Sequence, residues 1–146
     1  MREIRILLVE DNEGDIVLTL KALRSAHVHN PIDVVRDGEE AIRFLHKEGA
    51  YAGAETPGLI LMDINLPKLD GKEVLAVIKN HETLRVIPVV MLTTSDSEKD
   101  IIQSYYHHAN CFITKPVNYK AFMEVIQTFK EFWISIVQLP KTPSDD

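Results

Sequence analysis

Three carboxylates stand at the ends of two apolar segments, where they could act together. Glu10 and Asp11 follow the apolar run ILLV, and Asp63 ends the run LILMD at residues 59–63. A carboxylate at the end of a buried strand is costly unless a partner compensates its charge. If the two segments are adjacent strands, about 4.8 Å apart, the three negative charges repel one another. A shared proton or a bound cation would relieve that repulsion.

Oxygen ligands around an open site favour a hard divalent cation, so Mg²⁺ or Mn²⁺ is expected among these acids. Asn65 lies two residues beyond Asp63, where its backbone carbonyl could supply a further oxygen ligand. A second interpretation stays open. Single acids at strand ends often cap the following helix, and a pair such as Glu10 and Asp11 often lies in a solvated turn. The third acid, on the neighbouring strand, favours the metal site.

A hydroxyl and an ammonium group are expected beside these acids. The apolar run IPVVMLTT ends in Thr93 and Thr94, and the segment FITKP places Lys115 just before Pro116. Next to a metal ion, such groups suit a phosphoryl group, whose oxygens accept hydrogen bonds. One carboxylate could then act as a nucleophile and form an aspartyl phosphate. Taken singly, the same residues indicate only strand-end threonines and a surface lysine.

An alternation of short apolar runs and amphipathic segments must position these residues. Wholly apolar runs of strand length indicate strands that are buried on both faces of a parallel sheet. The segments between them have apolar residues at helical spacing, so right-handed βαβ units in one doubly wound α/β domain are predicted. The expected strand order is 2-1-3-4-5, with the site beyond the carboxyl ends of the strands. Five strands are expected at 4–9, 32–36, 58–63, 87–94 and 111–114, and five helices at 14–28, 38–49 (stopped by Gly49), 71–81, 97–109 and 118–137.

Composition limits the classes of function. The chain has 146 residues, 45% apolar and 26% charged, which fits one globular domain. A net charge of −6 argues against nonspecific binding of nucleic acid, and the single cysteine, Cys111, excludes an internal disulfide and a cysteine-rich zinc site. No apolar run reaches the roughly 20 residues of a membrane helix, and the N-terminus lacks a signal-peptide pattern. A cytoplasmic protein that does not insert into a membrane is therefore expected.

The chain resembles the receiver domains of two-component response regulators. Four segments carry this resemblance, in the family's order and over nearly the whole chain: VEDN at 9–12, LILMDINLPKLDG at 59–71, PVVMLTT at 88–94 and FITKP at 112–116. The resemblance implies a flavodoxin-like (CheY-like) fold, with a receiver domain at 1–138 and a polar tail at 139–146. It also implies a signalling switch and not a conventional enzyme. A histidine kinase supplies the phosphoryl group, and the receiver catalyses only its own phosphorylation and dephosphorylation.

The resemblance also implies individual roles. It implies a Mg²⁺ site, Asp63 as phosphoacceptor, a switch hydroxyl, a phosphate-binding cation and a cis peptide before Pro116. The metal site would comprise Glu10, Asp11, Asp63 and Asn65, and the other groups would be Thr93 and Lys115. Two positions depart from the family pattern. Phe112, at the position of the switch aromatic, has no hydroxyl, and Thr94 is bulkier than the small residue common there.

A narrower resemblance joins the chain to stand-alone regulators that are paired with cyanobacterial and bacterial phytochromes. The segments EDNEGDIVLTLKAL at 10–23 and FWISIVQLP at 132–140 carry it. It implies a phytochrome as the histidine kinase partner. Neither a DNA-binding motif nor an enzyme domain follows the last expected helix, so output through protein contacts is expected.

The last expected helix has more apolar residues than one docking face requires. They form two stripes, the first with Phe122, Ile126, Phe129 and Trp133, the second with Val125, Phe132 and Ile136. The first stripe suits packing on the sheet. The second predicts a homodimer through the face built by the fourth helix, the fifth strand and the fifth helix. Alternatively, both stripes lie in one broad core face or under the C-terminal tail.

Three other functions match parts of the pattern. A phosphohydrolase with an aspartate nucleophile would need a second acid where the segment DIN at 63–65 has Asn65. A flavin-binding module would need a hydroxyl- and glycine-rich loop where EDNEGD at 10–15 is acidic and repels phosphate. A degenerate receiver that acts as a scaffold would lack part of the acidic, threonine and lysine set, which is intact here.

Overall fold

One parallel sheet forms the centre of the molecule. The computed structural model describes residues 4–94 and 111–128, and within them the strand order is β2-β1-β3-β4-β5, as predicted. Strand β3 is buried along its whole length, as a strand covered on both faces must be. The strands are β1 (Ile6–Val9), β2 (Ile32–Val35), β3 (Leu59–Asp63), β4 (Val89–Thr93) and β5 (Cys111–Thr114).

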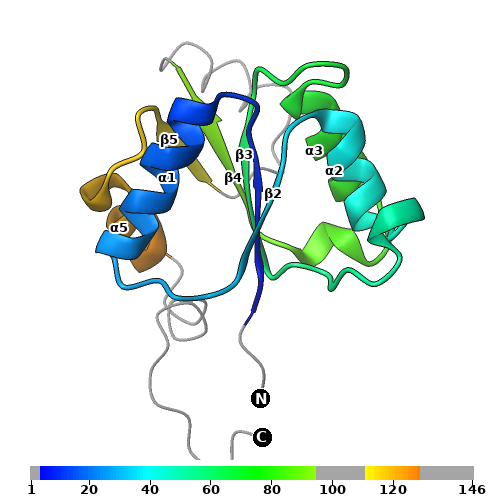
Figure 1. The fold of residues 1–146 in the computed structure, drawn as a ribbon, viewed down its shortest axis with the longest axis horizontal. Helices are drawn as coiled ribbons and strands as arrows, with labels where there is room; N and C mark the ends of the chain where they lie inside the picture. The colour runs from blue at the N-terminus through cyan, green and yellow to red at the C-terminus, as the bar shows by residue number, and fades with distance from the viewer. Residues whose placement is uncertain (1–3, 95–110, 129–146) are drawn as a thin grey trace, which may run out of the picture.

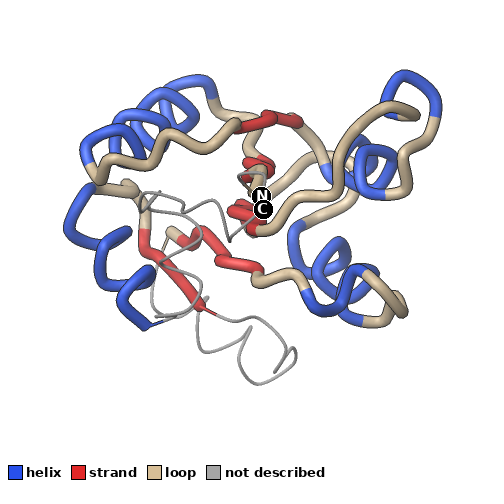
Figure 2. The backbone as a smooth tube through the Cα atoms, turned by 90° about the horizontal axis from the view of Figure 1, so that it is seen from below, coloured by secondary structure: helices blue, strands red, loops and turns tan. Residues whose placement is uncertain are grey.

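Helices cover both faces of the sheet. Figure 1 shows α1 and α5 on one side of the strands and α2 and α3 on the other, and the view along the strands in Figure 2 shows the same three layers. The elements are α1 (Glu13–Ser25), α2 (Gly38–Leu45), α3 (Gly71–Lys79) and α5 (Tyr119–Thr128), with short 3₁₀ turns at Gly49–Tyr51 and Leu84–Val86. The predicted helix at 97–109 and the predicted helical residues beyond 128 lie outside the described residues.

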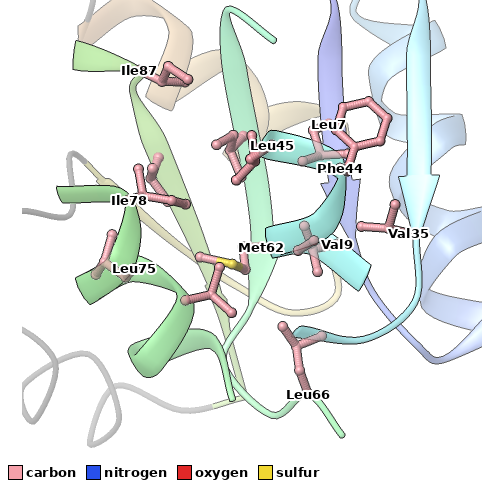
Figure 3. Packing of buried hydrophobic residues seen from close by; sticks show 14 of the residues in the cluster. Leu7, Val9, Val35, Phe44, Leu45, Met62, Leu66, Leu75, Ile78 and Ile87 are labelled. Atoms are coloured by element: carbon pink, nitrogen blue, oxygen red, sulfur yellow. The ribbon is translucent and has the colours of Figure 1, made fainter. Parts of the chain in front are cut away.

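Two apolar clusters hold these layers together. On the α2 and α3 side, side chains from both helices pack against alternate residues of the strands, among them Leu7, Val9 and Met62 (Figure 3). On the α1 and α5 side, Leu8 and Leu61 from the strands share a cluster with Phe122 of α5. Phe122 is fully buried, as the first predicted stripe of the last helix requires. This packing fixes the carboxyl ends of the strands relative to one another.

Two predicted helix ends are wrong because polar residues end the helices before the apolar pattern does. Helix α1 ends at Ser25 and not at residue 28, since His27 adopts a left-handed conformation with φ 61°. Helix α2 ends at Leu45 because Lys47 has φ 57°, so Lys47 and not Gly49 is the stop. In both cases the chain folds back, with Val28 N–H donating to Leu23 and Glu48 N–H to Arg43. The other predicted ends that fall within the described residues coincide with the observed ones or differ by at most two residues.

Each of the helices α1, α2 and α3 begins at a capping side chain. Asn12, Asp37 and Asp70 accept hydrogen bonds from the backbone N–H groups of the residues three positions later. In α3, Glu73 also accepts from the backbone of Asp70, which completes a capping box. These caps place the loops after β1, β2 and β3 at one edge of the sheet.

Candidate functional site

The predicted site residues meet at the carboxyl edge of the sheet. Asp63 is the last residue of β3 and Thr93 is the last of β4. Glu10 directly follows β1, whose Val9 pairs with Met62 of β3, and Lys115 directly follows β5. Parallel strands end at the same edge, so the register alone brings these four residues to one edge of the sheet. This edge is the one at which open α/β sheets bind their ligands.

Three carboxylates form a compact acidic cluster there. One oxygen from each of Glu10, Asp11 and Asp63 lies within 4.8 Å of the other two. Glu10 and Asp63 are buried, whereas Asp11 is exposed. Asn65 is exposed, and its backbone N–H donates to Asp63 Oδ1 over 3.2 Å. The cluster therefore combines two buried carboxylates with one that faces solvent, an open arrangement that suits a hydrated divalent cation.

Lys115 supplies the positive charge in this structure. Its Nζ atom donates to Asp63 Oδ2 at 3.0 Å and to Asp15 Oδ2 at 2.8 Å, and it forms an ion pair with Glu10 Oε1 at 2.9 Å. The lysine side chain is only 12% exposed, so solvent screens these contacts weakly. An ammonium group has three protons, and here three carboxylates surround it.

The electrostatics of the site follow from burial and from crowding of like charges. Burial, and next to it the Asp63 carboxylate, raises the pKa of Glu10 to about 7, although Lys115 and the N–H of Asn12 favour the ionised form. Burial lowers the pKa of Lys115, but its hydrogen bonds to three carboxylates outweigh burial and raise that pKa above its usual range. The lysine is therefore charged at neutral pH, while Glu10 lies near its midpoint.

Thr93 and Phe112 lie on the same face of the sheet. Phe112 pairs with Met91 in the β4–β5 ladder, so Thr93, two residues beyond Met91, projects toward the same face. Phe112 is half-buried against the apolar cluster on the α2 and α3 side. Thr93 is fully buried, and its Oγ1 has no hydrogen-bond partner among the described residues. Buried hydroxyl groups normally have a hydrogen-bond partner, so we expect this one to form a hydrogen bond with a ligand when the ligand is bound.

Backbone features of the loop after β5 also match the predictions. The peptide between Lys115 and Pro116 is cis, as the resemblance implies. The Lys115 N–H donates to the Thr93 carbonyl over 2.6 Å, which continues the β4–β5 ladder past the end of β5. This hydrogen bond holds the backbone of Lys115 next to the end of β4, the strand that carries Thr93.

One residue of the site was not predicted from the sequence. Asp15 lies in the first turn of α1 and reaches Lys115, one hundred residues further along the chain. Acids are common in first turns because the helix dipole favours them, so the residue type carried no distinct signal. Thr94 and Asn65, also predicted at the rim, are exposed at this edge.

Among the described residues, no helix is long and apolar enough to cross a membrane.

Comparisons with known proteins agree with this geometry. Residues 6–127 match the model of the family described as "Response regulator receiver domain". The chain is 45% identical over 135 residues to the response regulator Rcp1 of Synechocystis sp., a match that covers 92% of each protein. The Mn²⁺-bound form of Rcp1 superposes with a TM-score of 0.73, at 44% identity over 94% of this chain and 99% of that structure.

Two further solved structures are similar over nearly the whole chain. The bacteriophytochrome response regulator RtBRR has a TM-score of 0.88 at 40% identity and covers 97% of this chain and 84% of its own. The phosphorylated cyanobacterial phytochrome response regulator RcpA has a TM-score of 0.75 at 48% identity, covering 96% of this chain and all of its own. The family model, the strand order and the clustered acids lead to one assignment. The chain belongs to the response regulator receiver domain family and is homologous to phytochrome response regulators.

Proposed function

We propose that this receiver accepts a phosphoryl group on Asp63 from a histidine kinase, with Mg²⁺ bound at the acidic cluster. Receiver domains are signalling proteins that take phosphoryl groups from histidine kinases. The observation that supports the specific assignment is the position of Asp63. Asp63 belongs to the cluster of acids and lies 3.0 Å from the Lys115 ammonium, as Glu10 does at 2.9 Å. Asp63 is the one of these two acids that ends strand β3, which is the position that the family resemblance implies for the phosphoacceptor.

The residues fit a divalent cation. Glu10, Asp11 and Asp63, together with the backbone carbonyl of Asn65, would hold Mg²⁺ through oxygen atoms. Two buried carboxylates of like charge, one with a raised pKa, indicate that positive charge beyond that of Lys115 is favourable here. When bound, the ion supplies charge neutralisation for the phosphoryl oxygens. The Mn²⁺-bound structure of the relative Rcp1 supports a divalent ion in this chain as well.

The chain's own residues account for the transfer. An Asp63 carboxylate oxygen attacks phosphorus in line, the phosphorus–nitrogen bond to the kinase histidine breaks, and its electron pair returns to the histidine nitrogen. Lys115 Nζ is positioned to donate to one phosphoryl oxygen, and the Thr93 hydroxyl, which has no hydrogen-bond partner among the described residues, to donate to another. Hydrolysis of the acyl phosphate by water returns the carboxylate. Phosphorylation and dephosphorylation of its own Asp63 are the two reactions that we assign to the chain.

We infer that Thr93 and Phe112 transmit the phosphorylation state. Movement of the Thr93 hydroxyl toward the phosphoryl group would vacate space on the face of the sheet that Phe112 shares. The phenylalanine ring could fill that space without the hydrogen bond of a tyrosine. The two residues would thus shift the equilibrium between an inactive and an active conformation of the receiver toward the active one.

The proposed partners follow from the relatives and from the sequence. RtBRR and RcpA are described as bacteriophytochrome and phytochrome response regulators, which supports a phytochrome as the kinase of this chain.

Homodimerisation stays a prediction from the second apolar stripe of the last helix, whose side chains lie outside the described residues. Light scattering at high micromolar concentration, with and without phosphorylation, tests it, and a monomer in both states would contradict it. The domain limits at 1–138 and the cytoplasmic location also stay predictions.

Intact-mass spectrometry after incubation with acetyl phosphate tests the proposed function. A phosphoryl adduct should form in the presence of Mg²⁺, and it should be absent with EDTA and in Asp63→Asn. The control Glu39→Gln removes one negative charge from an exposed position on α2 and should be modified like the wild type. An adduct that survives in Asp63→Asn would contradict the assignment. Steady turnover of a generic phosphate ester would favour the phosphohydrolase instead.

A further inference from the structure

The Lys115 ammonium has one carboxylate partner that does not belong to the metal cluster. Glu10 and Asp63 are members of the cluster, whereas Asp15 is not, yet Asp15 makes the shortest of the three contacts. We propose that Asp15 is a positioning residue. It holds the Lys115 ammonium at the site when the cation and the phosphoryl group take over the charges of Glu10 and Asp63. This inference rests on the proposed function of Asp63.

The position of Asp15 is well defined by its own helix. Asn12 caps α1, and its Oδ1 accepts from the Asp15 N–H over 2.9 Å. The neighbouring Ile16 is buried in the core cluster between α1 and the sheet. The Asp15 side chain is 31% exposed, so its contact with Lys115 spans the boundary between the buried acids and solvent. A carboxylate fixed in this way can act as a permanent partner.

The other two partners of Lys115 change their charge during the proposed reaction. A divalent cation among the acids shares the charges of Glu10 and Asp63, and it also repels the ammonium group. Once an Asp63 oxygen is esterified to phosphorus, that oxygen no longer carries a carboxylate charge. Asp15 retains its full charge in each of these states. It therefore becomes the main protein anchor of Lys115 when the lysine must contact a phosphoryl oxygen.

Glu13 provides a matched comparison within the same helical turn. Both acids lie in the first turn of α1, where either one interacts favourably with the helix dipole. Glu13, however, pairs with Arg36 at 2.6 Å, and both of those side chains are more than half exposed. Glu13→Gln therefore removes the same charge from the same turn without affecting Lys115. A difference between Asp15→Asn and Glu13→Gln isolates the contact with the lysine.

The first experiment reads the lysine directly and needs no phosphorylation. The side-chain ¹⁵N ammonium resonance of Lys115, assigned with Lys115→Arg, is followed by NMR in saturating Mg²⁺. In the wild type and in Glu13→Gln the resonance should persist, because a bound ammonium exchanges its protons slowly with water. In Asp15→Asn the exchange should be about tenfold faster, as expected for the loss of one charge-assisted hydrogen bond near the surface. Equal exchange rates in Asp15→Asn and the wild type overturn the proposal.

The second experiment uses the rate of phosphorylation by acetyl phosphate and Mg²⁺ in a double-mutant cycle. Asp15→Asn should lower the rate about tenfold in the wild-type background and have no further effect in the Lys115→Met background. A merely structural role for Asp15 would lower the rate in both backgrounds and would overturn the proposal. A wild-type protein that forms no adduct overturns the proposed function, and the ammonium resonance then still decides whether Asp15 anchors Lys115.

Discussion

The ammonium group of Lys115 reaches across the end of β4 and lies 3.0 Å from Oδ2 of Asp63, which ends β3. Two strands that are not neighbours are thereby joined by one ion pair, and Thr93 at the end of β4 lies between them. In the metal-free protein, Lys115 supplies the positive charge that the crowded acids require. In the proposed reaction it supplies that charge to the incoming phosphoryl group. The Lys115–Asp63 ion pair is therefore expected to affect the stability of the protein, its affinity for the metal ion and its rate of phosphorylation.

Lys115→Met should destabilise the metal-free protein strongly. Removal of the ammonium leaves the buried Glu10 and Asp63 without a compensating charge, which should lower the free energy of unfolding by about 3 kcal/mol at pH 7. Mg²⁺ should restore part of the loss. Urea denaturation with EDTA and with Mg²⁺ measures both quantities. Lys68→Met is the control, because Lys68 is 58% exposed and contacts Asp37 only at 3.7 Å, so its loss should be within about 0.5 kcal/mol. Equal losses in the two variants would count against this interpretation.

The metal-free protein should lose stability as the pH rises from about 4.5 to about 7. The folded protein holds the Glu10 proton up to a pKa of about 7, whereas the unfolded chain releases it near 4.5. The stabilisation that the bound proton provides is complete below the pKa of Glu10 in the unfolded chain. It is lost as the pH rises through the pKa of Glu10 in the folded protein. The free energy of unfolding should therefore fall by at most roughly 3 kcal/mol across this window.

A pH series of urea denaturation in EDTA measures the contribution of Glu10. Glu10→Gln should abolish that fall, since the amide does not titrate, and Glu13→Gln should leave it unchanged. In the same pH window Mg²⁺ affinity should rise with pH for the wild type, because the cation requires the ionised carboxylate. A Glu10→Gln profile that parallels the wild type would show that another group is responsible.

Thr93→Val should separate function from stability. Valine keeps the shape of threonine and removes a buried hydroxyl that has no partner among the described residues, so stability should be unchanged or slightly higher. Phosphorylation by acetyl phosphate should slow about tenfold, since the phosphoryl oxygen loses one hydrogen-bond donor. Thr93→Ser, which keeps the hydroxyl, should remain within about threefold of the wild type. Comparable rates for the valine and serine variants would indicate that the hydroxyl is not used.

Gly71→Ala should displace the loop that carries the site. An added Cβ would lie 2.3 Å from the carbonyl oxygen of Asp63, and the Gly71 N–H donates to Ile64 over 2.8 Å. The backbone must therefore move, at a cost of about 2 kcal/mol, and Mg²⁺ affinity should fall with it. Gly53→Ala is the control because a Cβ added there would have no atom within 4 Å among the described residues. Thermal unfolding and a Mg²⁺ titration compare the two variants, and an unchanged Mg²⁺ affinity in Gly71→Ala would argue against the close approach.

Residues on strands were predictable from the sequence because strand order and register determine where they lie. The wholly apolar run before Asp63 indicated a buried parallel strand, and the alternation of elements indicated a doubly wound fold, for which 2-1-3-4-5 is a common strand order. Once these are known, Glu10, Asp63, Thr93 and Lys115 must share one edge. The placement of these four residues at one edge could therefore be predicted without knowledge of any side-chain conformation.

Residues on helices and in loops were harder to predict. Asp15 depends on how α1 is rotated against the sheet, which its apolar pattern specifies only within a broad face. The end of α2 at Leu45 depends on Lys47 in a left-handed conformation that lysine rarely adopts, and the nearby Gly49 was the more favourable stop on propensity alone. In both cases tertiary packing and local backbone hydrogen bonds override the residue type.

The central claim, that Asp63 is the residue that accepts the phosphoryl group, is tested most directly by chemical trapping. The protein is incubated with acetyl phosphate and Mg²⁺, reduced with borohydride, which converts an aspartyl phosphate to homoserine, and mapped by peptide mass spectrometry. Homoserine should appear at position 63, and it should be absent when Mg²⁺ is chelated. Homoserine at any other acid, or at none while Mg²⁺ is saturating, would contradict the account.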